Sequence, residues 1–175
     1  DGSVVTWCFG HLLEQAEPDA YLPDDVPRTK KGSKVWRFED LPIYPKNWKL
    51  LPKNDKGVKK QLATIGKLLK KASLVVHAGD PDREGQLLVD EVLEHFRYTG
   101  RVQRFWVSAQ DSASIRKGLT NLRDNETFDG MRLAALGRSR ADWLLGMNLS
   151  RAYTLARQAQ GKKELIAVGR VQTST

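Results

Sequence analysis

The sequence has little cysteine, no long apolar run and, outside one stretch, almost no proline. Its single thiol, Cys8, excludes an internal disulfide and Cys-rich zinc sites, and it fits a reducing compartment such as the cytoplasm. No apolar run approaches the ~18 residues that a membrane-spanning helix needs, so we expect no membrane-spanning segment. Six of the seven prolines fall within residues 18–52. This clustering predicts one irregular excursion, over residues 18–53, in an otherwise regular chain.

Positive charge is plentiful. The 29 Lys and Arg residues outnumber the 21 Asp and Glu residues, which gives a net charge of +8. Residues 28–71 alone hold fourteen basic side chains and three acidic ones. A basic surface attracts polyanions, with nucleic acid as the first candidate and an anionic membrane as the second. A Lys-rich helix face is also typical of an ordinary solvated surface, so charge alone leaves the partner open.

Apolar spacing predicts alternating strands and helices. The expected strands are 4–9, 34–38, 74–78 and 101–108, and the expected helices are 55–71, 86–96 and 111–122. Asn54 or Asp55 is expected to cap the first helix. The apolar residues expected to face inward are Val58, Leu62, Ile65, Leu68 and Leu69 in the first helix, and Ile115, Leu119 and Leu122 in the third. Such alternation favours an α/β fold with a mainly parallel sheet flanked by helices. Residues 129–160 lack proline and are rich in Ala, Leu and Arg, which predicts one long helix or two broken near Gly146.

Two tryptophans of the excursion, Trp36 and Trp48, lie among basic residues. Aromatic rings between cations can stack on unpaired bases. The same rings can instead pack the excursion onto the core, and this second interpretation is the one we favour.

An acidic motif, Asp80-Pro81-Asp82-Arg83-Glu84-Gly85, follows the predicted buried strand and precedes a helix. In open α/β sheets, ligands bind at the carboxyl ends of strands. Three close carboxylates repel one another unless a cation neutralises them, and oxygen ligands on a short loop suit Mg²⁺. The motif therefore predicts a magnesium site, with a solvated acidic turn as the alternative. His11, beside Gly10, is either a neighbour of this site or a packed structural histidine.

The acidic motif resembles the signature of the Toprim domain, and four further stretches resemble type IA DNA topoisomerases, most closely bacterial topoisomerase III. In order, the five are 5–14, 40–43, 77–91, 140–154 and 168–173. The resemblance implies a Toprim domain over residues 1–124 and the start of a helical DNA-groove domain over 125–175. It also implies that both ends are cut from a longer bacterial protein. The first Toprim strand, which ends in a Glu, would then precede Asp1.

The resemblance also implies roles for residues. Asp80 and Asp82 would bind Mg²⁺, and Glu84 would be a further ligand and a catalytic group. The implied DNA contacts are Gly169, Arg170, Val171, Gln172, Arg138, Asp142 and Tyr153. A salt bridge between Arg138 and Asp142 is expected from their spacing of four residues.

Type IA topoisomerases cut one DNA strand through a 5′-phosphotyrosine, pass another strand through the gap and reseal it with Mg²⁺ and without ATP. The resemblance thus implies a cytoplasmic, nucleoid-associated monomer that acts on DNA, preferentially single-stranded at the cleavage site. The family places its nucleophilic tyrosine well downstream of the segment 169–172, so we expect the isolated chain to lack it and to be inactive. The run Tyr44-Pro45-Lys46 looks like the context of that nucleophile, but it precedes the acids, so we reject it. The alternatives are another Toprim protein, such as a primase or nuclease, and a non-catalytic DNA-binding module.

Overall fold

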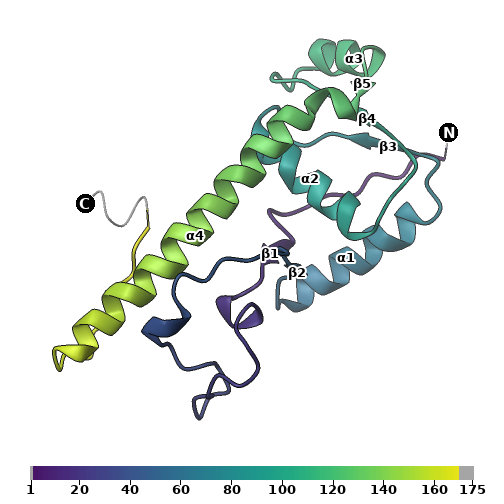
Figure 1. Ribbon diagram of the computed structural model, residues 1–175. Helices are drawn as coiled ribbons and strands as arrows, with labels where there is room; N and C mark the ends of the chain where they lie inside the picture. The colour runs from purple at the N-terminus through teal and green to yellow at the C-terminus, as the bar shows by residue number, and fades with distance from the viewer. Residues whose placement is uncertain (1, 170–175) are drawn as a thin grey trace. The chain divides into compact units, whose positions relative to one another are not determined.

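A computed structural model describes residues 2–169, which form two compact units (Figure 1). Of these residues, 2–14 and 50–137 make up the first unit, and 15–49 and 138–169 make up the second. The units are groups of closely packed residues, so the expected domain boundary between residues 124 and 125 stays a prediction.

The first unit contains the main sheet, and its class is α/β as predicted. The elements follow the order β1 (Leu13–Gln15), β2 (Leu50–Pro52), α1 (Lys56–Leu69), β3 (Leu74–His77), α2 (Arg83–His95), β4 (Arg101–Arg104), α3 (Ser112–Thr120) and β5 (Arg123–Asp124). A 3₁₀ turn, η3 (Asn125–Phe128), then leads into α4 (Asp129–Ala159), whose later part belongs to the second unit. β3 and β4 pair in parallel, β5 adds antiparallel to β4, and β1 and β2 form a separate small sheet.

The core of the first unit lies between α1, α2 and β1. As expected, Asp55 caps α1 by accepting a hydrogen bond from the Val58 amide at 2.9 Å. The apolar stripe predicted for α1 is buried except for Leu68, which is half-buried. The core comprises Leu12, Leu13, Val58, Leu62, Ile65, Leu69, Val92 and Leu93. Val75 of β3, the strand that precedes the acidic motif, packs against this core.

Three local expectations are wrong. Residues 4–9 form no strand, and Val5 is 87% exposed. A run of β-branched residues forms a strand only where another strand pairs with it. Residues 34–38 are also not a strand; they contribute only a single bridge, between Arg28 and Lys34. In α3, Ile115 and Leu119 were expected to point inward but are 37% and 55% exposed.

The second unit packs the excursion against α4. Its 3₁₀ turns are η1 (Pro18–Ala20) and η2 (Phe38–Asp40). Trp143 of α4 is buried, donates to the Ala16 carbonyl at 3.1 Å and meets Trp48 edge to face. Trp36 lies 4.5 Å from the guanidinium carbon of Arg151. These contacts support the packing interpretation of Trp36 and Trp48.

The helix α4 is continuous through Gly146, so the broken alternative is wrong. The side-chain amide of Asn148 binds both backbone groups of Ile43, accepting from its N–H and donating to its carbonyl. Over residues 2–169, no helix is both long and apolar enough to span a membrane.

Candidate functional site

The acidic motif occupies the connection between β3 and α2 in the first unit. Asp80 lies in the loop, while Asp82 caps α2 by accepting a hydrogen bond from the Gly85 amide at 2.7 Å. This cap lets the helix begin at Arg83, three residues earlier than predicted, so Glu84 lies in its first turn rather than on the loop. A helix N-terminus favours acidic groups there. All three carboxylates are exposed to solvent.

Two glycines allow the loop to fold tightly onto the start of α2. A methyl group at Gly85 would lie 2.5 Å from the Asp80 carbonyl oxygen and 2.6 Å from its nitrogen. At Gly79 a methyl group would lie 2.5 Å from the Gly85 carbonyl oxygen. Only residues without a side chain fit at these positions, and this close contact fixes where Asp80 lies relative to α2.

Arg104, the last residue of β4, holds the loop from beneath. It is fully buried and donates from Nη1 to the carbonyls of Gly79 at 2.7 Å and His77 at 3.1 Å, and from Nη2 to that of Asp80 at 2.6 Å. Burial lowers the pKa of Arg104 to about 10, so its charge persists at neutral pH. β3 and β4 are parallel and His77 is in register with Arg104, which puts this cation at the strand end where the acidic loop starts.

A buried polar network fixes Arg104 in turn. Its Nε donates to Gln86 Oε1 at 2.8 Å, which orients the Gln86 amide so that Nε2 donates to Asp90 at 2.7 Å and to Asn125 at 2.9 Å. Asn125 closes the network by donating to Asp90 at 2.8 Å. Every polar atom of the Gln86 side chain is therefore satisfied, as a buried amide requires.

His77 is buried and neutral. The Gly79 amide donates to its Nδ1 at 3.1 Å, so the proton is on Nε2, which donates to the Gln86 carbonyl at 3.2 Å. Burial, and then the charge of Arg104, lower the pKa of His77 to about 4. This histidine is a structural part of the loop rather than a proton donor at neutral pH.

His11 lies near the acidic motif and is half-exposed. Its Nδ1 meets the buried carboxylate of Glu91 at 2.9 Å. The hydrogen bond to Glu91 is the main reason that the pKa of His11 is raised, and the charge of Glu84 adds to the rise. The bond to Glu91 fits a packed structural histidine, and the smaller effect of Glu84 fits a neighbour of the acidic site, so both interpretations of His11 stay predictions.

A metal site is not preformed. Within residues 2–169, no group of three or more His, Cys, Asp or Glu side chains is placed to hold an ion. One oxygen of Asp82 is engaged by the Gly85 amide, which leaves its second oxygen, Asp80 and Glu84 facing solvent. Mg²⁺ needs only one or two carboxylates because it keeps several waters, so the chemistry of these groups fits that ion.

The expected DNA contacts lie elsewhere in the chain. Arg138 and Asp142 on α4 are 4.0 Å apart, as their spacing predicted, and Tyr153 is 54% exposed. Gly169 ends a segment that runs back along α4, where Ser150 Oγ accepts from the Val168 amide at 2.8 Å. Arg170, Val171 and Gln172 lie outside the described residues.

Sequence reasoning missed the residues that organise the loop, which are Arg104 and its network of Gln86, Asp90 and Asn125. It also missed Glu91, the partner of His11. A signal for part of this set is present, since Gln86 and Asp90 are polar residues four apart on the face of α2 that otherwise carries Leu93 and Val89. The strand predicted over residues 101–108 ends already at Arg104, so the position of this cation at the sheet edge, beside the end of β3, was not predicted.

The chain is similar to known proteins in sequence and in fold. Residues 1–110 match the family model described as "Toprim domain". DNA topoisomerase 3 of Vibrio cholerae is 49% identical over 99% of the chain, and that of Haemophilus influenzae is 47% identical over 99%. The chain spans 26% of the length of each relative. The solved structure of topoisomerase I from Thermotoga maritima shares the fold, with a TM-score of 0.56, 24% identity, and coverage of 94% of this chain and 23% of that one.

Proposed function

The chain belongs to the Toprim domain family, and from this premise we propose that it is part of a type IA DNA topoisomerase of the topoisomerase 3 kind. One observation carries the proposal: relatives of that name align with almost the whole chain, including the stretches that follow residue 110. A primase or nuclease would account for the Toprim match over residues 1–110 but not for the alignment beyond it.

The proposed reaction is a reversible transesterification of DNA. A tyrosine oxygen bonds to the phosphorus of one strand while the 3′ oxygen leaves, and the covalent 5′-phosphotyrosine stores the bond energy. After another strand has passed through the gap, the 3′ hydroxyl attacks the same phosphorus and the tyrosine leaves, so no ATP is needed. We propose that none of the four tyrosines in the chain is this nucleophile and that these 175 residues alone do not cleave DNA.

We propose that Asp80, Asp82 and Glu84 hold Mg²⁺ for the religation step. When bound, the ion supplies positive charge next to the reacting phosphate and the 3′ hydroxyl. The chain's own contribution is position: Arg104 fixes the backbone of Asp80, and the cap by Asp82 sets the start of the helix that carries Glu84. Glu84 is the proposed catalytic group of this set, because its carboxylate faces solvent within the electrostatic influence of His11.

DNA is the proposed partner, single-stranded at the site of cleavage. The proposed contacts are Arg138, Asp142, Tyr153, Gly169, Arg170, Val171 and Gln172, which combine cations for phosphate with an aromatic ring for stacking. The net charge of +8 supports a polyanionic partner. We further propose that the protein works as a monomer in the bacterial cytoplasm, close to the nucleoid.

Plasmid relaxation by the full-length protein that contains this chain tests the function. We expect wild type to relax negatively supercoiled plasmid with Mg²⁺ and without ATP, and Asp80→Asn or Glu84→Gln to slow relaxation at least about tenfold. Glu94→Gln, an exposed carboxylate near the other end of α2, is the matched control and should retain activity. Absence of relaxation by wild type, or full activity of both site variants, would refute the proposal.

A further inference from the structure

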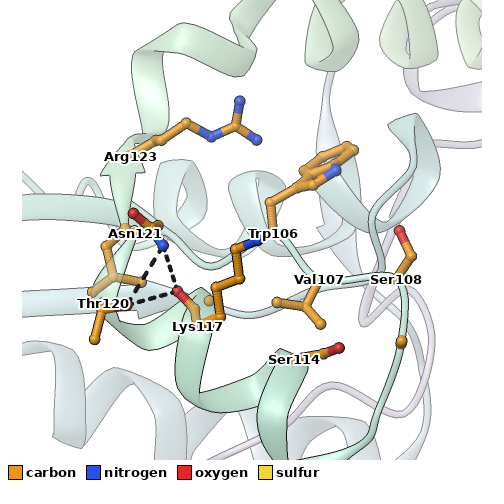
Figure 2. A pocket seen from close by; sticks show the side chains of 11 residues that line it. Trp106, Val107, Ser108, Ser114, Lys117, Thr120, Asn121 and Arg123 are labelled. Atoms are coloured by element: carbon orange, nitrogen blue, oxygen red, sulfur yellow. Dashed lines mark hydrogen bonds between the residues drawn. The ribbon is translucent and has the colours of Figure 1, made fainter.

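A pocket of about 720 Å³ lies beside α3 in the first unit (Figure 2). The connection from β4 to α3 forms one wall, and the end of α3 with the start of β5 forms another. It is wide open to solvent, as a site for one unit of an extended polymer must be. The lining residues that matter chemically are Trp106, Lys117, Arg123, Ser108, Ser114 and Thr120.

The pocket is basic without compensating acids. Lys117 and Arg123 both line it, and no Asp or Glu does. In the part of the chain that the structure describes, neither cation forms a salt bridge with a carboxylate. Two unpaired cations in one concave site create a positive potential, which attracts an anion such as a phosphate.

An aromatic wall completes the pocket. Trp106 is half-exposed and stacks on buried Phe128, with the ring centroids 4.8 Å apart and the planes 16° from parallel. The guanidinium of Arg123 lies over Phe128 at 4.4 Å and is 5.9 Å from the centroid of Trp106. Figure 2 shows the side chains of Arg123 and Trp106 in the pocket. A flat ring held rigidly from behind, beside cations, is the arrangement on which proteins stack the bases of single strands.

We propose that this pocket binds one nucleotide unit of single-stranded DNA, with the base against Trp106 and a phosphate between Lys117 and Arg123. The hydroxyl groups of Ser108 and Ser114 offer hydrogen bonds to the same unit. This inference rests on the proposed function, because it takes DNA as the polymer that the protein handles. It adds a contact on α3 that is separate from the groove residues of α4.

Arg104 connects the pocket to the acidic loop. Its guanidinium carbon is 4.8 Å from the centroid of Trp106, and its Nη2 is 2.6 Å from the Asp80 carbonyl. The side chain that supports the acidic loop therefore also touches the aromatic wall. A strand seated in the pocket would be held at a fixed position relative to Asp80.

Binding of a fluorescent oligothymidylate at several salt concentrations tests the pocket. We expect Lys117→Gln and Arg123→Gln each to weaken binding about threefold to tenfold and to reduce the salt slope by about 0.7, the value for one lost phosphate contact on a single strand. Lys60→Gln, at an exposed lysine of α1, is the matched control and should change neither quantity. Equal urea midpoints for the variants would show that the fold is intact.

Crosslinking locates the strand directly. An oligonucleotide carrying 5-iododeoxyuridine, irradiated on the protein, should attach to the peptide that contains Trp106, and Trp106→Phe should retain binding. If Lys117→Gln and Arg123→Gln kept the wild-type salt slope of binding while Arg138→Gln reduced it, the proposed binding in the pocket would be refuted and the proposed function would stand. No oligonucleotide binding by any form would overturn both. If free thymidine monophosphate competed with the same affinity as the oligonucleotide, the ligand of the pocket would be a mononucleotide and not a strand.

Discussion

Replacing Gly85 by alanine should loosen the acidic loop, and the size of the effect follows from the structure. The added methyl group would lie 2.5 Å, 2.6 Å and 2.9 Å from three backbone atoms of Asp80, about 1 Å closer than ordinary contact. Backbone cannot rotate away as a side chain can, so the Asp80 loop must move. Overpacking of this kind costs about 1–3 kcal/mol.

Helix propensity acts in the other direction. Gly85 lies in the first turn of α2, where alanine gains up to about 1 kcal/mol over glycine. We therefore expect a net loss of about 1–2 kcal/mol in the free energy of unfolding. With a urea m-value of about 2 kcal/mol/M, the unfolding midpoint falls by about 0.5–1 M. Because Asp80 is displaced, binding of Mg²⁺ by the chain should weaken as well, as calorimetry can measure.

Gly130→Ala is the matched control for this experiment. It lies in the first turn of α4, where an added methyl group would have nothing within 4 Å. Here only the gain in helix propensity remains, so the urea midpoint should hold or rise. If Gly85→Ala were as stable as wild type and bound Mg²⁺ equally well, the contact between Gly85 and Asp80 would not determine the geometry of the loop.

Three further results are expected. Arg104→Lys leaves buried carbonyls of the loop without donors, so it should lower the free energy of unfolding by about 3–5 kcal/mol, measured by urea denaturation. A loss below about 1 kcal/mol would contradict the role given to Arg104. Because the pKa of His11 is raised in the folded state, its pair with Glu91 stabilises the fold fully below pH ~6.5, and this stabilisation is lost as the pH rises through the folded pKa. Glu91→Gln should therefore reduce the free energy of unfolding more at pH 6 than at pH 9. The same variant should lower the pKa of His11, as NMR can measure. For His77 the pKa shift is in the opposite direction. Its folded pKa of about 4 means that the free energy of unfolding falls as the pH drops from ~6.5 toward 4, and His77→Gln should flatten this pH dependence.

The main elements around the site follow from local pattern. The bounds of β3 and α1 were predicted to within about two residues, because local signals mark them. These signals are the β-branched run of β3, the capping residue Asp55 and the apolar stripe of α1. The start of α2 was placed too late because Asp82 was considered only as a metal ligand. Its short carboxylate is also a good N-cap, and the cap draws Glu84 into the helix.

The sequence by itself determined the α/β class, the position of the acidic motif at a strand end and the family to which the chain belongs. These depend on residues close together in the chain, where spacing and turn chemistry act directly. Only the tertiary structure decided what holds the motif, because Arg104 reaches the Asp80 carbonyl from β4, and Asn125 fixes the network around Arg104 from η3, both distant in sequence. It also decided that residues 4–9 are not a strand, since a strand requires hydrogen-bonding partners that no local pattern supplies.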